Sequence, residues 1–305
     1  MNAKTDSPPE NDRSSSGSEA SYIIADIGGT NARLAVYTPE ESGPIRHQDP
    51  MRFKCSQFKS LADVINTYLE QTGRKVDGAC VSIAGPTDRD CIEMTNLDWS
   101  FSISDYKKTL GLKTLLVIND GAAAALATTR VEPSQLENIK PGTVEAHGSR
   151  LNLIPGTGVG LGCIIPHDNG WLPVLSEGGH ATLAAVTQEE YDVLQVITGE
   201  FGRAVGDNVL SGPGMFNIYK ALAVVRGHRP LDMDAKEMTR LALEREDEIC
   251  SDALNLYFTL FGRLAGDLAL TLNAHGGIYL SGSLMQRIGA ENIRQSFNNG
   301  FTDKD

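Results

Sequence analysis

The chain has 305 residues, which favours two modest domains over one small core. Its 27 basic and 39 acidic residues give a formal net charge of −12, which disfavours a nucleic-acid groove or an anionic membrane surface as a partner. The composition of 22% charged and 41% hydrophobic residues indicates a globular protein, and charges and glycines interrupt the apolar runs, which excludes a transmembrane helix. The five scattered cysteines form no CxxC pair, which argues against a zinc site or a disulfide framework.

Polar residues rich in serine, with two prolines, open the chain, and 1–20 is predicted to be a disordered tail. Apolar runs at 22–26 and 33–37 flank a glycine pair and predict a β-hairpin. A third strand is expected near 51–54, and apolar residues at helical spacing predict a helix over 57–70. Further elements are predicted as strands at 78–84 and 115–118 and an alanine-rich helix at 121–129. The alternation of strands and helices indicates a mixed α/β sheet.

The second half repeats strand, glycine turn and strand at 151–165, a weak internal repeat of 22–37. Helical spacing then predicts helices over about 188–202, 214–225, 236–247 and 250–273. A short strand at 277–280 and one last helix opened by Ser281-Gly282 complete the prediction. Prolines and glycines mark a loop-rich stretch at 120–150, and the domains are therefore predicted as 21–125 and 126–305.

Two glycine-rich turns could each bind a phosphate group. In Asp26-Ile27-Gly28-Gly29-Thr30 the glycines let backbone N–H groups point at an anion, and Asp26 could hold Mg²⁺ through water. Gly156-Thr157-Gly158 opens a second run of glycines, whose spacing matches neither the P-loop nor the dinucleotide fingerprint. A tight hairpin turn would explain the glycines of either run, but not the acid, two glycines and hydroxyl together at 26–30. The occurrence of one run in each half of the chain favours a bound polyphosphate.

Polar side chains follow a predicted buried strand at Asn119 and Asp120, where open α/β sheets carry their sites. Asp120 has two roles open to it, the N-cap of the next helix or a general base, and residue frequencies favour the cap. Glu177 and His180 lie three residues apart beside two glycines. They could hydrogen-bond neighbouring hydroxyls of a sugar, or form only a capped turn. The sequence contains no HExxH or GxSxG motif that would indicate a metalloprotease or a serine hydrolase.

Eight stretches in the same order make the chain resemble the bacterial glucokinase family, whose members share the two-lobed actin-like ATPase (ribonuclease H-like) fold of sugar kinases. The stretches are 25–35, 82–86, 94–101, 118–120, 155–160, 177–180, 209–214 and 276–282. The resemblance implies that ATP, with Mg²⁺, phosphorylates the 6-hydroxyl of D-glucose and feeds glycolysis in the cytoplasm. It also implies a homodimer as an expectation. The net charge of −12 is the reason why neither nucleic acid nor a membrane is expected as a partner.

The resemblance assigns roles to individual residues. In the family the Asp of the Asn-Asp pair takes the proton of the primary hydroxyl, and here that base is Asp120. The expected sugar-binding residues are Asn119, Asp120, Glu177, His180 and Asp207. The residues expected to bind the nucleotide are Ala25, Asp26, Ile27, Gly28, Gly29, Thr30, Gly156, Thr157 and Gly158, with Asp26 holding Mg²⁺ through water. The first phosphate motif and the base are expected in the smaller domain, and the second motif and the adenosine side in the larger one.

The sequence departs from the family in three places. Asp207 stands where the family usually has a glutamate, so Asp207→Glu is expected to bind glucose at least as well as the parent. Ser281-Gly282-Ser283 replaces one glycine of the usual late pair, which puts a Cβ at a turn on the nucleotide side. Family members continue past the position of Asp305 through a strand, a loop and a helix, so the larger domain is expected to be C-terminally incomplete, with an uncovered sheet edge.

Two other functions stay open at this point. A kinase for mannose, fructose or an N-acetylhexosamine would use similar residues, although the lack of cysteine between Cys163 and Cys250 argues against the zinc-bearing branch of sugar kinases and repressors. A catalytically impaired sugar-binding or regulatory protein is the second alternative. The retained Asp120 argues against it, and the short C-terminus argues for it.

Overall fold

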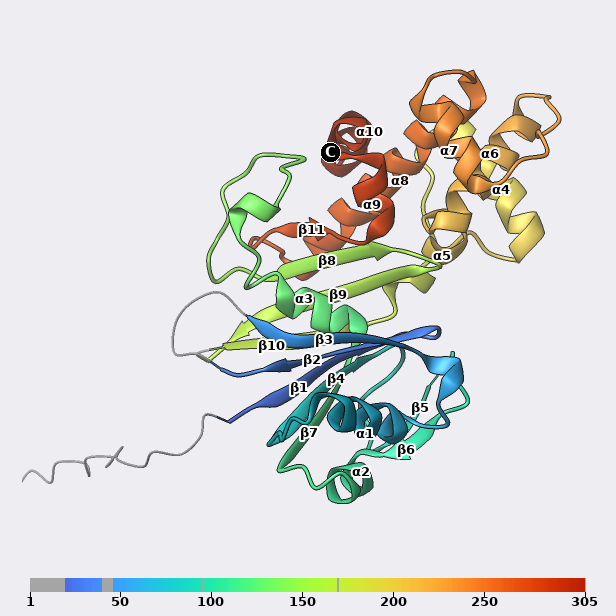
Figure 1. Cartoon of the computed structure of the whole chain (residues 1–305). Helices are drawn as coiled ribbons and strands as arrows, with labels where there is room; N and C mark the ends of the chain where they lie inside the picture. Colours follow the sequence, from blue (N-terminus) through green and yellow to red (C-terminus); the bar gives the residue numbers. More distant parts are fainter. Residues whose placement is uncertain (1–19, 40–45, 95, 169, 305) are drawn as a thin grey trace, which may run out of the picture. The chain divides into compact units, whose positions relative to one another are not determined.

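The computed structural model describes residues 20–39, 46–94, 96–168 and 170–304 (Figure 1). The predicted tail lies outside these residues except for Ala20. The chain divides into two compact units, and unit 1 extends to Val81 and resumes over Arg89–Val117. Unit 2 comprises Ser82–Asp88 and Ile118–Asp305. Asp120 therefore belongs to unit 2, whereas the predicted boundary had placed it in the smaller domain.

Unit 1 is built on a five-stranded sheet with the strand order β3-β2-β1-β4-β7, in which β4 and β7 end in unit 2. The strands are β1 (Tyr22–Ile27), β2 (Asn31–Tyr37), β3 (His47–Lys54), β4 (Gly78–Ile83) and β7 (Thr114–Asn119). β1 and β2 pair antiparallel with Tyr22 opposite Tyr37, which confirms the predicted glycine-turn hairpin. The sequence did not predict the short β5 (Cys91–Glu93), β6 (Ser100–Ser102) and α2 (Ile103–Thr109).

Helix α1 (Leu61–Thr72) begins where Ser60 accepts a hydrogen bond from the Asp63 N–H, and it ends at Gly73, whose φ is +64°. Its buried residues, Leu61, Val64, Ile65 and Tyr68, follow the predicted helical spacing. The predicted helix at 57–70 is thus confirmed with a later start, because the 3₁₀ turn Cys55–Gln57 precedes it.

Unit 2 contains a four-stranded sheet with the order β10-β9-β8-β11. Its strands are β8 (Arg150–Pro155), β9 (Val159–His167), β10 (Gly170–Ser176) and β11 (Ile278–Leu280). β8 and β9 pair antiparallel with Pro155 opposite Val159, which confirms the second predicted hairpin, and β11 pairs with β8 in parallel. β10 was not predicted; it carries Pro173 and lies at the edge of the sheet, where proline is tolerated.

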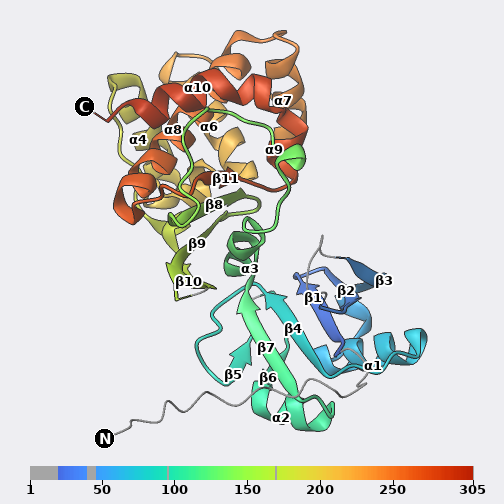
Figure 2. The ribbon, with the colours of Figure 1, turned by 90° about the vertical axis from the view of Figure 1, so that its left-hand side faces the viewer.

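Helices cover one face of this sheet (Figure 1). They are α4 (Gln188–Phe201), α5 (Gly206–Val209), α6 (Gly212–Val225), α7 (Ala235–Leu243), α8 (Glu248–Leu272), α9 (Ser283–Ile288) and α10 (Ala290–Thr302). Leu161 and Cys163 of β9 point into this helical core. Because side chains alternate along a strand, Gly162 faces the other side, where α3 (Asp120–Ala127) packs on β9 (Figure 2).

The helix boundaries in the C-terminal part differ from the prediction in two places. α7 ends at Leu243 instead of 247, since Arg245 adopts a φ of +57° and Asp247 caps α8 by accepting from the Cys250 N–H. The single last helix is in fact two, α9 and α10. Gly289, with a φ of +82°, separates them and stops the first helix after Ile288.

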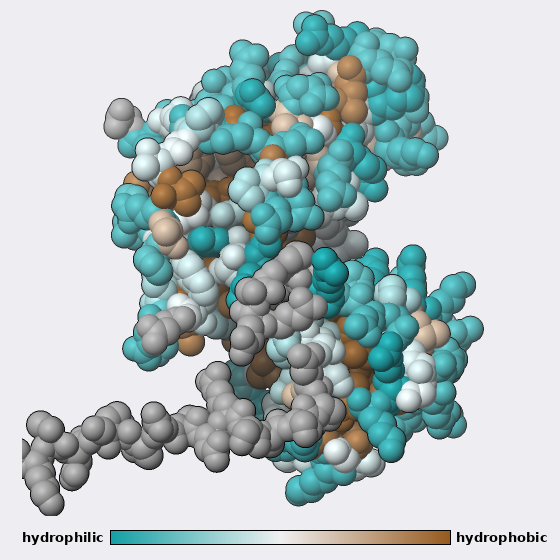
Figure 3. Space-filling model, turned by 60° about the vertical axis from the view of Figure 1, so that its left-hand side comes forward, coloured by the Kyte–Doolittle hydropathy of each residue, from teal (hydrophilic) through white to brown (hydrophobic). Residues whose placement is uncertain are grey.

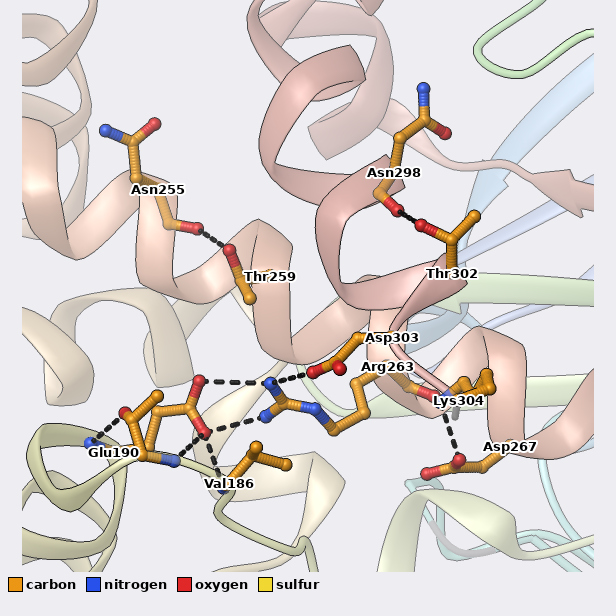
Figure 4. A network of polar contacts seen from close by, with 11 residues as sticks. Val186, Glu190, Asn255, Thr259, Arg263, Asp267, Asn298, Thr302, Asp303 and Lys304 are labelled. Atoms are coloured by element: carbon orange, nitrogen blue, oxygen red, sulfur yellow. Dashed lines mark hydrogen bonds and ion pairs between the residues drawn. The ribbon is translucent and has the colours of Figure 1, made fainter.

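α10 packs on α8 through glycines, and ion pairs join α8 to α4 and to the residues that follow α10. A Cβ on Gly262 would overlap the carbonyl oxygen of Phe297, so α8 and α10 are in direct backbone contact there. Arg263 of α8 donates to both carboxylate oxygens of Glu190 at 2.8 and 3.1 Å and lies 3.3 Å from Asp303 (Figure 4). Lys304 donates to the Arg263 carbonyl at 3.0 Å, which ties the last described residues to α8.

Within the described residues, no helix is both long and apolar enough to cross a bilayer. The face of the molecule in Figure 3 is mostly hydrophilic, with apolar side chains in small groups between polar ones.

Candidate active site

Asn119 and Asp120 lie where β7 ends and α3 begins. Asn119 is the N-cap: its Oδ1 accepts from the Ala122 N–H at 3.1 Å, and its Nδ2 donates to the Gly85 carbonyl at 3.1 Å. Asp120 is the first helical residue, so the preference for Asp120 as the cap was wrong. The neighbouring amide takes that role because Gly85 holds it in place. The Asp120 Oδ1 accepts from the Gly121 N–H at 2.8 Å, at a helix end whose dipole favours negative charge.

The second glycine turn connects β8 and β9 and lies beside the N-terminus of α6. Its own bond runs from the Gly156 N–H to the Gly158 carbonyl at 2.8 Å. The Gly212 N–H, at the first residue of α6, donates to the Gly156 carbonyl at 2.8 Å. The Ser211 hydroxyl caps the helix by accepting from the Gly214 N–H at 3.0 Å. A glycine turn beside the N-terminus of a 14-residue helix is an arrangement that suits a phosphate group.

The structure brings Glu177, His180 and Asp207 together. His180 lies in the 3₁₀ turn Gly178–His180 that follows β10, and its side chain is 66% exposed. Its Nε2 is 4.0 Å from the Glu177 Oε2, and its Nδ1 is 3.6 Å from the Asp207 Oδ2. Two carboxylates and an imidazole that converge in this way can bind several hydroxyl groups of one sugar ring.

Glycines allow this convergence. A Cβ on Gly179 would overlap the Val159 carbonyl and lie 2.6 Å from the Asp207 Oδ1. A Cβ on Gly206 would lie 2.7 Å from the Gly179 carbonyl, and one on Gly158 would lie 3.0 Å from the Asp207 Oδ2. The missing side chains therefore let three segments meet. The packing role of these glycines was not predicted from the sequence.

β9 links this cluster to the helix that carries Asp120. Leu161 of β9 pairs with Ser176 of β10, which places Glu177 at the next position along that edge. A Cβ on Gly121 would lie 2.9 Å from the Leu161 carbonyl. The start of α3 and the turn with Glu177 thus lie against the same strand.

Asp207→Glu is expected to weaken glucose binding several-fold, contrary to the expectation from the sequence. The Asp207 Oδ1 already accepts from the Val159 N–H at 2.8 Å, and its carboxylate lies against the Cα positions of Gly158 and Gly179. A longer side chain has to give up this bond or push the turns apart. Glucose titration of both proteins checks the effect, and tighter binding by the variant would show that the shorter side chain limits the reach.

The first glycine turn belongs to unit 1 and is anchored by Cys55, the residue that directly follows β3. The Gly28 N–H donates to the Asn31 carbonyl at 3.0 Å. Cys55 holds the same turn twice: its N–H donates to the Thr30 carbonyl at 3.0 Å, and its Sγ lies 3.3 Å from the Gly28 carbonyl oxygen. A Cβ on Gly29 would lie 2.7 Å from the Asn96 Cβ. Ala25 and Ile27 of the predicted set are buried, so they can offer a ligand only their backbone.

Asp26 is the only residue that the sequence analysis assigned to a metal ion. Its carboxylate forms an exposed ion pair with Arg33 across the hairpin at 2.9 Å. Among the described residues, no three His, Cys, Asp or Glu side chains are grouped so that they could hold a metal ion by themselves. An exposed carboxylate such as that of Asp26 can hold a water of a magnesium ion whose other ligands are phosphate oxygens and water, which is the role expected from the sequence.

The turn on the expected adenosine side is less strained than the sequence suggested. Gly282, with a φ of +100°, occupies the only position there that requires a glycine, and Ser283 is the first residue of α9. The serine that replaces the usual glycine therefore adopts an ordinary helical conformation.

A protein-family model described as Glucokinase matches residues 23–305. The chain belongs to the glucokinase family. The glucokinase of Saccharophagus degradans is 39% identical to it over 267 residues, which are 87% of this chain and 83% of that protein.

Solved structures agree with membership in the glucokinase family. The crystal structure of a glucokinase from an Antarctic psychrotroph has a TM-score of 0.86 and 34% identity, and the match covers 93% of this chain and 89% of that one. The ROK family glucokinase of Streptomyces griseus, in complex with glucose and AMPPNP, has a TM-score of 0.60 at 19% identity, with 93% and 90% coverage. The second likeness speaks for the fold alone. These neighbours confirm the predicted α/β actin-like ATPase fold.

Proposed function

We propose that this glucokinase family member transfers the γ-phosphate of ATP to the 6-hydroxyl of D-glucose, with Asp120 as the general base. Membership in a family of ATP-dependent glucose kinases over residues 23–305 is the observation that carries the activity. The position of Asp120 at the first residue of α3, beside a capping Asn119, supports its role. The expected cytoplasmic location and the homodimer stay predictions.

The reaction needs a base because a primary hydroxyl is a weak nucleophile. As the 6-oxygen bonds to the γ-phosphorus, its proton passes to the Asp120 carboxylate, and the bond from that phosphorus to the bridging oxygen of ADP breaks. The Gly121 N–H holds one carboxylate oxygen at 2.8 Å and so orients the base. The products are glucose 6-phosphate and ADP.

Four side chains are proposed to hold the sugar in place. The Asp207 and Glu177 carboxylates accept from hydroxyl groups, and His180 between them can donate or accept. The amide of Asn119 uses one lone pair for Ala122 and one N–H for Gly85, and its second lone pair and second N–H suit a sugar hydroxyl. The Saccharophagus degradans glucokinase, at 39% identity, supports glucose as the ligand.

The two glycine turns are proposed, each by itself, as phosphate-binding elements. In unit 2 the turn Gly156–Gly158 offers backbone N–H groups beside the N-terminus of α6, and α9 after Gly282 is the proposed adenosine side. In unit 1 the glycine turn after Asp26 likewise offers backbone N–H groups to a phosphate. Mg²⁺ bound to ATP would neutralise phosphate charge, and Asp26 would hold its water. Membership in a family of ATP-dependent glucose kinases supports ATP as the donor.

The activity is tested by measuring ADP release from Mg²⁺-ATP with and without glucose, together with glucose 6-phosphate. Glucose should raise ADP release and yield one glucose 6-phosphate per ADP. Without product, but with a glucose-dependent rise of the thermal midpoint, the chain would be a sugar-binding protein instead. Faster turnover with mannose, fructose or an N-acetylhexosamine would assign a related hexose as the substrate.

A further inference from the structure

We propose that Gly162 is a positioning residue for Asp120. Its missing side chain lets α3 pack with its backbone directly on β9, and this contact sets the place of Asp120 relative to the second glycine turn and the sugar-binding cluster. The inference rests on the proposed role of Asp120 as the base.

The contact between Gly162 and α3 is a contact of main chains. A Cβ on Gly162 would overlap the Gly121 carbonyl oxygen, and it would lie 2.7 Å from the Gly121 carbonyl carbon and 2.9 Å from the Ala125 Cβ. Gly121 and Ala125 are four residues apart and therefore stack on one face of α3. A side chain at position 162 would thus have to move the helix as a body, since no single side chain could turn away.

Backbone conformation does not explain the glycine. The φ of Gly162 lies outside the left-handed region, so any residue could adopt the local conformation. Gly160 lies two residues earlier on the same face of β9, and a Cβ there would be 3.4 Å from the Ile154 Cβ, which is close to ordinary contact. The requirement at Gly162 is therefore specific to the approach of α3, and it is distinct from phosphate binding by the turn before Val159.

β9 holds two parts of the proposed site, the second glycine turn and Asp207. The strand begins at Val159, directly after the glycine turn, and the Val159 N–H holds Asp207 at 2.8 Å. At about 3.3 Å per residue, Gly162 lies about 13 Å along the strand from Gly158. Asp120 precedes Gly121, the residue that touches Gly162. A shift of α3 would therefore move the base against a glycine turn and a sugar cluster that stay with the strand.

Gly162→Ala is the test, with Gly262→Ala as its matched control. In both variants the new Cβ overlaps a backbone carbonyl, but at Gly262 the overlap is with Phe297 of α10. Both proteins should lose several degrees of thermal midpoint. Gly162→Ala alone should lose kcat, by roughly 10- to 100-fold, because a displacement of about 1 Å costs this much. Its glucose Kd should stay within about fivefold, since three of the four proposed sugar-binding side chains, Glu177, His180 and Asp207, stay with β9 and only Asn119 moves with α3. An unchanged kcat, or an equal loss in both variants, would overturn the inference.

Gly121→Ala keeps the inference testable if Gly162→Ala does not fold. Its Cβ would lie 2.9 Å from the Leu161 carbonyl oxygen and 3.1 Å from the Asn119 Oδ1, so the shift is smaller. Alanine also has the better helix propensity. We expect a several-fold lower kcat with an unchanged or higher thermal midpoint. Parental kcat in this variant would likewise overturn the inference.

A double-mutant cycle with Asp120→Asn separates this inference from the proposed function. If Gly162 acts through Asp120, Gly162→Ala should not lower the residual rate of Asp120→Asn any further. A purely structural effect would lower that rate by the same factor as in the parent and would overturn the inference. Parental turnover by Asp120→Asn would remove the base role and the inference with it. An inactive Asp120→Asn beside a fully active Gly162→Ala would overturn the positioning role alone.

Discussion

Asp120→Asn is expected to lower kcat roughly 10²- to 10⁴-fold while glucose still binds with an affinity within about threefold of the parent. Asparagine has the shape of aspartate, and its Oδ1 can keep the bond from the Gly121 N–H that holds Asp120 at 2.8 Å. The amide cannot take the proton of the 6-hydroxyl. The measurements are kcat from glucose 6-phosphate production and the glucose Kd from titration.

Asp192→Asn is the matched control for this prediction. Asp192 lies on α4 in the same unit and accepts from the Gln188 side chain at 2.8 Å, so its substitution removes the same charge outside the proposed site. This variant should keep the parental kcat. Parental turnover by Asp120→Asn would exclude the residue as the base, and a large loss of glucose affinity would make it mainly a sugar-binding residue.

Glu190→Gln is expected to lower the free energy of unfolding by about 3–5 kcal/mol, the cost of leaving a buried charge with too few partners. The carboxylate of Glu190 is buried and accepts from Arg263 at 2.8 and 3.1 Å and from the Val186 N–H at 2.7 Å (Figure 4). Glutamine keeps one acceptor oxygen and turns an N–H₂ group toward the guanidinium. Among the described residues, the partly exposed Asp303 is then the one counter-charge left to Arg263. Urea unfolding measures the loss.

Glu200→Gln on the same helix is the control for the buried pair. Glu200 is 53% exposed and lies 3.5 Å from the Lys220 Nζ, so its substitution should change the stability by less than about 1 kcal/mol. An equal loss of the free energy of unfolding in the two variants would show that the buried Glu190–Arg263 pair contributes no more to stability than the exposed pair.

The same pair predicts a dependence of stability on pH. Burial raises the pKa of Glu190, but hydrogen bonds from Arg263 and from the Val186 and Thr187 N–H groups outweigh it and hold the pKa below its usual value. A lowered folded pKa adds stability that is fully present above the unfolded pKa of about 4.3 and is lost as the pH falls through the folded value. The parent should therefore lose more stability than Glu190→Gln on acidification below about pH 5. Parallel pH profiles of the two proteins would contradict this.

Local signals made much of the fold predictable. Each of the two hairpins, at 22–37 and 151–165, has a glycine turn between two apolar runs. The turn and the runs lie within a few residues of each other in the sequence. β10 lacks a continuous apolar run because Pro173 interrupts it. Leu172 and Leu175 are exposed, so the strand depends on its pairing with β9. The break between α9 and α10 depends on the positive φ of Gly289, which periodicity does not reveal.

In the candidate site, too, local motifs were predictable and contacts between distant segments were not. Motifs identified Asn119, Asp120, Glu177 and His180 as polar residues beside glycines or strand ends. Which residue of the Asn-Asp pair caps α3 was not predictable, because the Gly85 carbonyl that holds Asn119 comes from a distant segment. The role of Gly162 also depends on which helix packs on β9. Close approaches between distant segments leave no pattern in a single sequence.

The glycine contacts distinguish positions that set distances in the candidate site from positions that are proposed to meet the substrate, and this distinction matters for redesign. Glu177, His180 and Asp207 project from backbone that Gly158, Gly179 and Gly206 hold together. A library aimed at accepting another hexose can therefore randomise the three polar side chains, but it should leave the three glycines unchanged. Variants from such a library would differ in the pattern of sugar hydroxyls that they bind, while the backbone that carries the three side chains stays the same.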